Sequence, residues 1–236
     1  MGMWTVTKNR FVVYFNIMDF SGMVFRNDHK VVLEMMKHLS DRLGEMGKKE
    51  ATSPQIKQVL FSDSLLMISE DDSLNSAQEL SLAATRLLAA SLFKGIAMKG
   101  VMACGRQTAD FRRSIHFGEP FIEASLLEKE LMLYSVVLHH TAEEKMSGHK
   151  LLNSRDGFVD VVKYKTPMKS GNIYHYVLDW TKMNERMNSA EALNNLYSRI
   201  SGAERSYIDN TFEFVQHVSR RKETNGTKYL SPLLSK

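Results

Sequence analysis

Three times along the chain, two strand-like segments follow each other across a short polar turn, and this feature most constrains the fold. Apolar and β-branched residues dominate the segments. They pair as 58–61 with 65–69, 96–104 with 111–117, and 158–165 with 173–178. Because a short turn can join only antiparallel strands, we expect three hairpins. A further strand-like segment, RFVVYFNIM at 10–18, precedes them.

Segments with helical periodicity separate these pairs. They begin at Asn27, at a capping box that starts with Ser76, near Gly118 and after Thr181. Strands and helices do not alternate regularly, which disfavours a parallel sheet built of βαβ units. The sequence therefore predicts an α+β fold, in which helices pack on a mainly antiparallel sheet and further helices follow at the C-terminal end.

Composition and charge exclude several classes of protein. The chain has 236 residues, and its 31 Lys and Arg against 27 Asp and Glu leave a net charge of +4. This excess is too small to predict a stable complex with nucleic acid. The single cysteine, Cys104, cannot form an internal disulfide or a cysteine-based zinc site, which favours a cytoplasmic protein. The longest apolar stretch, 131–138, is far shorter than a membrane span, so no membrane association is expected.

Two aspartates occupy similar positions beside predicted strands. Asp19 follows the first strand in a predicted turn at 19–22, and Asp63 lies in the turn of the first hairpin. If that strand and that hairpin are neighbours, both carboxylates meet at one sheet edge. Carboxylate and carbonyl oxygens suit Mg²⁺ or Mn²⁺ and support phosphoryl transfer. Each aspartate taken alone is also explained by hydrogen bonds to its own turn.

The order and spacing of several motifs resemble the class III nucleotidyl cyclase family over residues 10–180. The segment 15–23 resembles the motif that carries the first metal-binding Asp, and 61–67 resembles the second, 44 residues later. Residues 100–105 resemble the central strand of the family, and 117–128 its Gly-Asp-x-x-Asn-x-Ala helix start. The resemblance implies a cyclase-type, ferredoxin-like sheet in a catalytic domain over 8–180, with a helical extension over 181–236.

The resemblance also implies a reaction and the residues that carry it. Asp19, Asp63 and the Phe20 carbonyl would hold two Mn²⁺ or Mg²⁺ ions, and the ribose 3′-hydroxyl would attack the α-phosphorus and release pyrophosphate. The implied nucleotide-binding residues are the amides of Phe20, Ser21, Gly22 and Met23, the base-pocket positions Val59 and Glu119, and the hairpin lysines Lys165 and Lys169. Such sites form between two subunits, so a homodimer is expected.

The sequence departs from the family at its base pocket and at its transition-state residues. Val59 stands where the purine-selecting Lys is expected, and Glu119 where its partner Asp is expected. Ile122 and Leu126 align with the family's Asn and Arg. A valine cannot donate a hydrogen bond to a purine. In its length and in this departure from the purine-selecting pattern, the chain most resembles the single-domain bacterial pyrimidine cyclases of the Pycsar antiphage system. That resemblance implies UTP as substrate and a cyclic nucleotide signal.

Two alternatives stay open. In the first, the missing positive charge of an active cyclase is supplied by an arginine of the segment 105–117, namely Arg106, Arg112 or Arg113. In the second, the chain is a degenerate cyclase-fold protein that binds nucleotide or a partner without turnover. An RNA-binding sheet is disfavoured, because no aromatic residue follows Lys99-Gly100 in the expected pattern.

Overall fold

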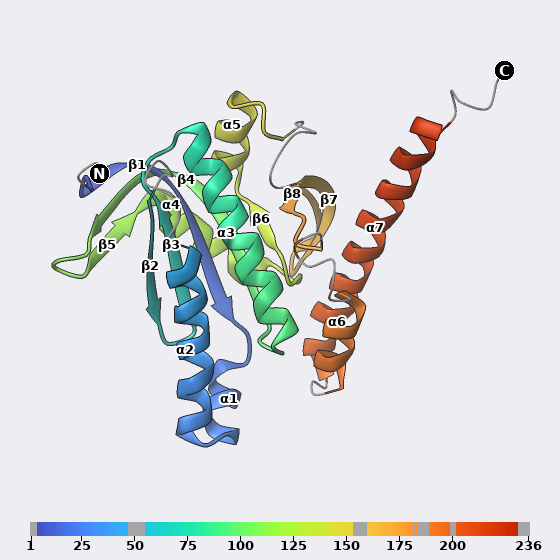
Figure 1. Ribbon diagram of the computed structural model, residues 1–236, viewed down its shortest axis with the longest axis horizontal. Helices are drawn as coiled ribbons and strands as arrows, with labels where there is room; N and C mark the ends of the chain where they lie inside the picture. Colours follow the sequence, from blue (N-terminus) through green and yellow to red (C-terminus); the bar gives the residue numbers. More distant parts are fainter. Residues whose placement is uncertain are drawn as a thin grey trace.

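The protein forms one mixed sheet with helices on both faces (Figure 1). The computed structural model describes residues 4–46, 55–152, 160–181, 183, 189–198 and 202–230. Its strands are β1 (Thr7–Ile17), β2 (Ile56–Phe61), β3 (Ser64–Ser69), β4 (Met98–Asp110), β5 (Ile115–Gly118), β6 (Val136–Leu138), β7 (Val161–Met168) and β8 (Gly171–Leu178). Its helices are α1 (Phe20–Arg26), α2 (His29–Met46), α3 (Leu74–Phe93), α4 (Glu119–Glu130), α5 (His140–Gly148), α6 (Ser189–Tyr197), the short 3₁₀ helix η1 (Gly202–Glu204) and α7 (Arg205–Leu230).

The strand order is β2-β3-β1-β4-β6-β8-β7, and β5 pairs with β4. Among the described strands only β4 and β6 run parallel. The three predicted hairpins are confirmed as β2–β3, β4–β5 and β7–β8, and with them the α+β fold. Residues 158 and 159 of the predicted third hairpin lie outside the described part of the chain.

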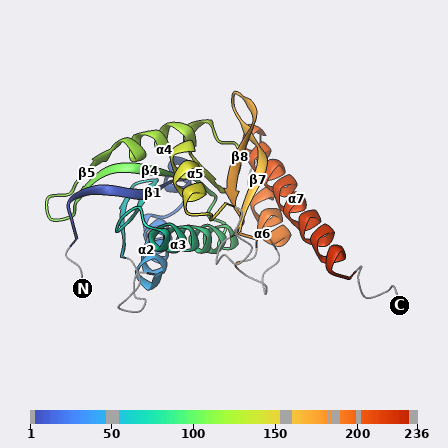
Figure 2. The ribbon, with the colours of Figure 1, turned by 90° about the horizontal axis from the view of Figure 1, so that it is seen from above.

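Side chains of β1 alternate between two apolar clusters, which explains why its whole length is hydrophobic. Phe11, Phe15 and Ile17 belong to the larger cluster with α3, whereas Val12 and Tyr14 face the smaller cluster beneath α4. Figure 2 shows α4 on one side of the sheet and α2 and α3 on the other. The first strand is therefore covered on both faces.

The C-terminal helices complete the larger cluster. Leu193 and Leu196 of α6 and Ile208 and Phe214 of α7 are buried in it. The far end of α7 extends away from the sheet (Figure 1). None of the helices in the described ranges is long and apolar enough to cross a membrane.

Two local predictions were wrong. The turn predicted at 19–22 is instead the beginning of α1, whose N-cap is Asp19 in the left-handed backbone region with φ 53°. At α3, the N-cap is Ser73 rather than Ser76, because the Ser73 side chain accepts a hydrogen bond from the Ser76 amide at 3.3 Å. The Ser76 hydroxyl instead donates to Asp71 at 2.6 Å. Both cases depend on side-chain contacts that local spacing does not reveal.

Candidate functional site

Pairing between β1 and β3 brings the turn of the first hairpin to the end of β1. Asn16 pairs with Ser64, and the Ile17 amide donates to the Asp63 carbonyl at 2.7 Å. Asp63 therefore lies beside Ile17, two residues before Asp19 in sequence. As expected from the sequence, both aspartates are at the same end of the sheet.

The Asp63 side chain is held by two neighbours. Asn16 Nδ2 donates to one carboxylate oxygen at 3.2 Å, and Ser64 Oγ donates to the other at 3.3 Å. Ser64 in turn lies 2.9 Å from the Tyr14 hydroxyl. A carboxylate has about four acceptor positions, so the two donors leave capacity for a cation. Sequence reasoning missed Asn16, although it is the one amide side chain in the apolar run that was predicted as a strand at 10–18.

Asp19 follows β1, and its carboxylate lies against Gly22 in the first turn of α1. The carboxylate forms an ion pair with Arg26 at the other end of that helix. Gly22 makes this possible, because a Cβ at this position would overlap both the Asp19 carboxylate and the Arg26 guanidinium. Arg26 was missed because nothing in its sequence spacing distinguishes it from a surface arginine.

The carboxylate oxygens of Asp19 and Asp63 and the nearby carbonyl oxygens fit a hard divalent cation. Oxygen ligands of this kind are those that Mg²⁺ and Mn²⁺ prefer. Across the described ranges, no group of three or more His, Cys, Asp or Glu side chains is arranged to hold a metal. A cation here would therefore need backbone carbonyls or ligand oxygens in addition to the two carboxylates.

The predicted phosphate-binding amides lie in the first turn of α1. Phe20, Ser21 and Gly22 are its first three residues, positions at which a helix leaves amides without internal partners. The Met23 amide differs, because it donates to the Asp19 carbonyl at 2.9 Å. Met23 therefore does not offer a free amide.

The two candidate arginines lie at the other end of the sheet. Met98 pairs with Ile17, whereas Arg106 pairs with Asn9. At the usual strand rise, the eight steps from Met98 to Arg106 span about 26 Å. Arg113 lies in the turn after β4 and forms an ion pair with Asp110 at 2.9 Å. Neither arginine is brought to Asp19 and Asp63 within one chain.

The predicted base-pocket positions line the face of the sheet that α4 partly covers. Val59 on β2 is half-buried and packs against the smaller apolar cluster, and Glu119 is exposed at the start of α4. Ile122 and Leu126 follow on the exposed side of α4, where 54% and 58% of their surface is accessible. This side of α4 therefore presents apolar side chains where the resemblance placed polar ones.

The two hairpin lysines are exposed but separated along β7 and its turn. Lys165 lies within β7, opposite Tyr174 on β8. Lys169 lies in the turn that follows, and its amide donates to the Glu130 carbonyl at the end of α4 at 2.8 Å. Lys169 also contributes to lowering the pKa of Lys99, which is mainly lowered by burial. The end of α4 thus lies near the beginning of β4, as do Asp19 and Asp63.

Comparison with known proteins supports the fold. No protein-family model matches the chain, and no curated protein matches it in sequence. Among solved structures, it is similar to the guanylate cyclase domain of RhGC from Catenaria anguillulae in complex with GTP, which is 12% identical with a TM-score of 0.51 over 73% of this chain and 96% of that one. A non-canonical dimeric guanylyl cyclase domain of the RhoGC fusion protein from Blastocladiella emersonii is 13% identical with a TM-score of 0.52 over 72% of this chain and 96% of that one.

A third solved structure extends the similarity to bacteria. A bacterial light-regulated adenylyl cyclase is 8% identical to this chain with a TM-score of 0.52 and covers 80% of this chain and 98% of its own. At such low identity the similarity describes architecture rather than chemistry. The chain therefore has the fold of adenylyl and guanylyl cyclase domains.

Proposed function

We propose that the protein is a metal-dependent nucleotidyl cyclase. It converts a nucleoside triphosphate, with UTP as the expected substrate, into a 3′,5′-cyclic nucleotide and pyrophosphate. The observation that supports this most strongly is the placement of Asp63 beside the end of β1, where Asp19 follows, on a sheet with the architecture of cyclase domains.

In this proposal, Asp19 and Asp63 hold two Mn²⁺ or Mg²⁺ ions with the Phe20 carbonyl. The ions, when bound, supply charge stabilisation for a phosphoryl-transfer transition state. Asn16 and Ser64 orient the Asp63 carboxylate through their hydrogen bonds. Arg26 forms an ion pair with the Asp19 carboxylate, which would be one of the ligands of the cation. The amides of Phe20, Ser21 and Gly22 and the ammonium groups of Lys165 and Lys169 receive the phosphates.

The proposed reaction is an intramolecular displacement at the α-phosphorus. The 3′-oxygen forms its bond to phosphorus as the bond to the pyrophosphate oxygen breaks, and the hydroxyl proton passes to solvent. Positive charge near the leaving group favours this step. Arg106 or Arg113 is proposed to supply it from a second copy, because both are too far from Asp63 within one chain.

A homodimer with its sites at the interface follows from this arrangement. One of the structural neighbours is described as a non-canonical dimeric guanylyl cyclase domain. The exposed apolar residues Ile122 and Leu126 on α4 provide a surface that a second copy could bury. We propose a cytoplasmic enzyme whose product signals phage infection, as in the pyrimidine cyclases that the sequence resembles.

A second candidate function is nucleotide or partner binding without turnover. The same apolar pair on α4 favours it, since Ile122 and Leu126 cannot donate hydrogen bonds to a ribose or a phosphate. The two functions differ in whether any triphosphate is consumed.

The deciding experiment incubates the purified protein with Mn²⁺ and each of the four ribonucleoside triphosphates, and identifies products by mass. Cyclic UMP with equimolar pyrophosphate is expected. Absence of a cyclic product from every triphosphate, together with binding of one of them, would establish the second candidate instead.

Two variants assign the chemistry to the site. Asp63→Ala should abolish turnover while circular dichroism remains unchanged. Asp41→Ala, which removes an exposed carboxylate from α2, should leave turnover unchanged. Full activity of Asp63→Ala would refute the metal-binding role of Asp63.

A further inference from the structure

A cavity opens between α2 and the segment that leads from α3 to β4. Its volume is about 450 Å³, which is in the usual range for sites that bind small molecules. Lys94 and Ile96 of that segment form one part of its wall. One strip of α2 forms the rest, namely Lys30, Val31, Glu34, Met35 and His38. None of these residues belongs to the metal, phosphate or base positions assigned above.

The cavity has an apolar wall because α2 packs on the core with a different face. Val32 and Leu39 of α2 are buried, whereas Val31 is 48% exposed. Val31 and Met35 are four residues apart, so they lie on the same side of the helix. α2 and α3 lie on the same face of the sheet (Figure 2), and Ile96, which follows α3, is buried. The side chains of Val31 and Met35 therefore face the cavity together with Ile96.

The charged groups of the cavity leave an excess of positive charge. Lys30 and Lys94 are exposed, and within the described ranges neither ammonium has a hydrogen bond or an ion pair. The carboxylate of Glu34 is already paired with Lys37 at 3.0 Å. His38 Nε2 is buried and has no hydrogen-bond partner among the residues described. The cavity thus offers two unpaired ammonium groups and one unused polar atom beside an apolar wall.

These features suit an anion that carries an aliphatic body. Ammonium groups form charge-assisted hydrogen bonds with anionic oxygens, and burial of aliphatic carbon against an apolar wall is favourable. We infer that the cavity binds a small amphipathic anion. Its anionic group lies at Lys30 and Lys94, and its aliphatic part lies against Val31, Met35 and Ile96. This site is additional to the proposed cyclase site and does not depend on cyclase activity.

The cavity lies at the end of the sheet where Asp19 and Asp63 are found. Ile96 is followed by Ala97, whose carbonyl accepts a hydrogen bond from the Met18 amide at 2.9 Å. Met18 directly precedes Asp19 in the chain. A ligand against Ile96 therefore lies next to the backbone contact that holds the residue before Asp19.

The test is a titration of the isotope-labelled full chain with sodium octanoate at pH 7, followed by NMR of the backbone amides. Octan-1-ol has the same chain without the charge, and acetate has the charge without the chain. Octanoate should shift the amides of Val31, Met35 and Ile96 with a single saturable dissociation constant. Octan-1-ol should bind about 10- to 100-fold more weakly, the value of one hydrogen bond to a charged group. Acetate should shift none of these amides at the same concentrations.

Three variants locate the ligand in the cavity. The double variant Lys30→Met with Lys94→Met keeps the aliphatic stems but removes both charges, and it should bind octanoate about 10- to 100-fold more weakly than the parent. Val31→Asp places a carboxylate on the apolar wall and should abolish binding. Asp is favourable in the first turn of a helix, and α2 begins at His29, so this variant should fold. Lys129→Met, which removes an exposed ammonium from α4, is the matched control and should bind as the parent does.

Three results would overturn the inference. The first is the absence of a saturable shift at the cavity amides, or shifts confined to other parts of the chain. The second is equal affinity for octanoate and octan-1-ol, which would make the cavity a site for neutral apolar molecules. The third is unchanged octanoate binding in the double lysine variant or in Val31→Asp. Because every readout is binding, a protein without cyclase activity would leave this test unaffected.

Discussion

Replacing Glu128 with glutamine should destabilise the protein strongly, because it removes the counter-charge of a buried ammonium. Lys99 Nζ lies 3.1 Å from a Glu128 carboxylate oxygen, and the two side chains are only 4% and 5% exposed. The same ammonium donates to the backbone carbonyls of Glu128 and Leu131, both at 2.8 Å. Lys99 thus links the end of α4 to β4, beside its strand partner Asn16 at the candidate site.

The magnitude follows from the two ways in which the variant can respond. If Lys99 remains charged, breaking a buried pair by removing one partner costs about 3–5 kcal/mol. If it instead loses its proton, the cost is bounded by the distance from its ordinary pKa of 10.5 to pH 7, which at about 1.4 kcal/mol for each unit is about 5 kcal/mol. Burial already lowers the pKa of Lys99 in the parent, so part of this cost is present there.

Urea unfolding at pH 7 and pH 9 measures the effect. With an m value of about 3 kcal/mol/M for a chain of this size, the midpoint should fall by about 1–2 M at pH 7. The folded state of the variant binds the Lys99 proton less tightly than the unfolded chain, so stability rises with pH below 10.5. If deprotonation of Lys99 sets the cost, the difference in unfolding free energy between the parent and the variant should be about 2–3 kcal/mol smaller at pH 9 than at pH 7.

The control is Glu34→Gln, the same change at an exposed residue of α2, which should alter stability by less than about 0.5 kcal/mol. A Glu128→Gln variant within about 0.5 kcal/mol of the parent at pH 7 would refute the reasoning. That result would mean that the two carbonyls satisfy the Lys99 ammonium without the carboxylate.

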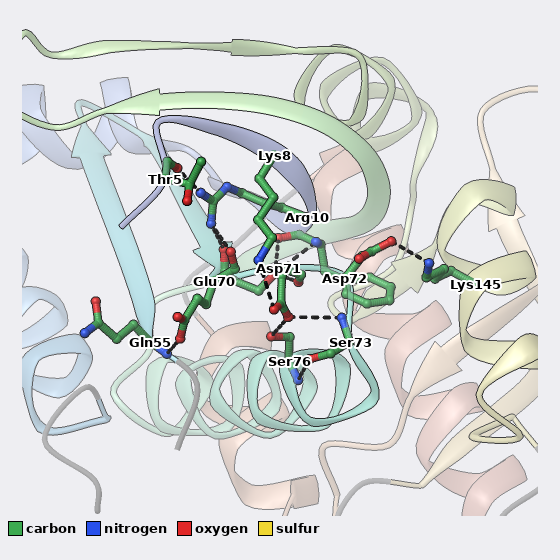
Figure 3. Close-up of polar contacts among 12 residues, drawn as sticks. Thr5, Lys8, Arg10, Gln55, Glu70, Asp71, Asp72, Ser73, Ser76 and Lys145 are labelled. Carbon is green, nitrogen blue, oxygen red and sulfur yellow. Dashed lines mark hydrogen bonds and ion pairs between the residues drawn. The ribbon is translucent and has the colours of Figure 1, made fainter. Parts of the chain in front are cut away.

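Two further predictions concern the candidate site and the start of α3. Gly22→Ala should displace the Asp19 carboxylate from Arg26 and lower cyclase activity about 10- to 100-fold. Because the ion pair that is lost is exposed, Tm should shift by no more than about 4 °C. Unchanged kinetics would contradict this prediction. Partial burial raises the pKa of Asp71, but hydrogen bonds from Ser73, Ser76 and Lys8 outweigh this and hold the pKa well below its usual range (Figure 3). The stability that the ionised Asp71 carboxylate contributes through these hydrogen bonds is fully present above the unfolded-state pKa of 3.8. It is lost as the pH falls through the folded-state pKa. Urea unfolding should therefore show Asp71→Asn about 1–3 kcal/mol less stable than the parent at pH 7, with the gap closing below pH 3.8; a gap independent of pH would contradict it.

Predictions from the sequence were correct where the structure depends on short-range patterns of residues. The alternation and apolar runs of 58–61 and 65–69 predicted the β2–β3 hairpin, because side-chain period and turn length are local properties. The same reasoning failed at 19–22, where a turn was predicted and α1 begins instead. There the outcome depends on Gly22 admitting a carboxylate from one helix end and a guanidinium from the other.

The candidate site divides in the same way. Asp19 and Asp63 could be singled out from sequence, since each follows or joins predicted strands at a recognisable spacing. Their hydrogen-bonding neighbours could not, because Asn16 reaches Asp63 only through the pairing of β1 with β3. The distance of Arg106 from this pair likewise follows from the length of β4 and is invisible in the sequence.

By itself, the sequence indicated the three hairpins, the mainly antiparallel α+β class and the two candidate aspartates, all of which depend on residue type and local period. Only the tertiary structure decided the strand order, the end of the sheet at which each charged residue lies, and the difference between Arg10 and Lys57, which are both cations beside Trp4. Burial and hydrogen bonds to backbone carbonyls hold the Arg10 guanidinium in place, whereas the Lys57 side chain is only partly buried. Such contacts join residues dozens of positions apart, so no pattern along the chain contains them.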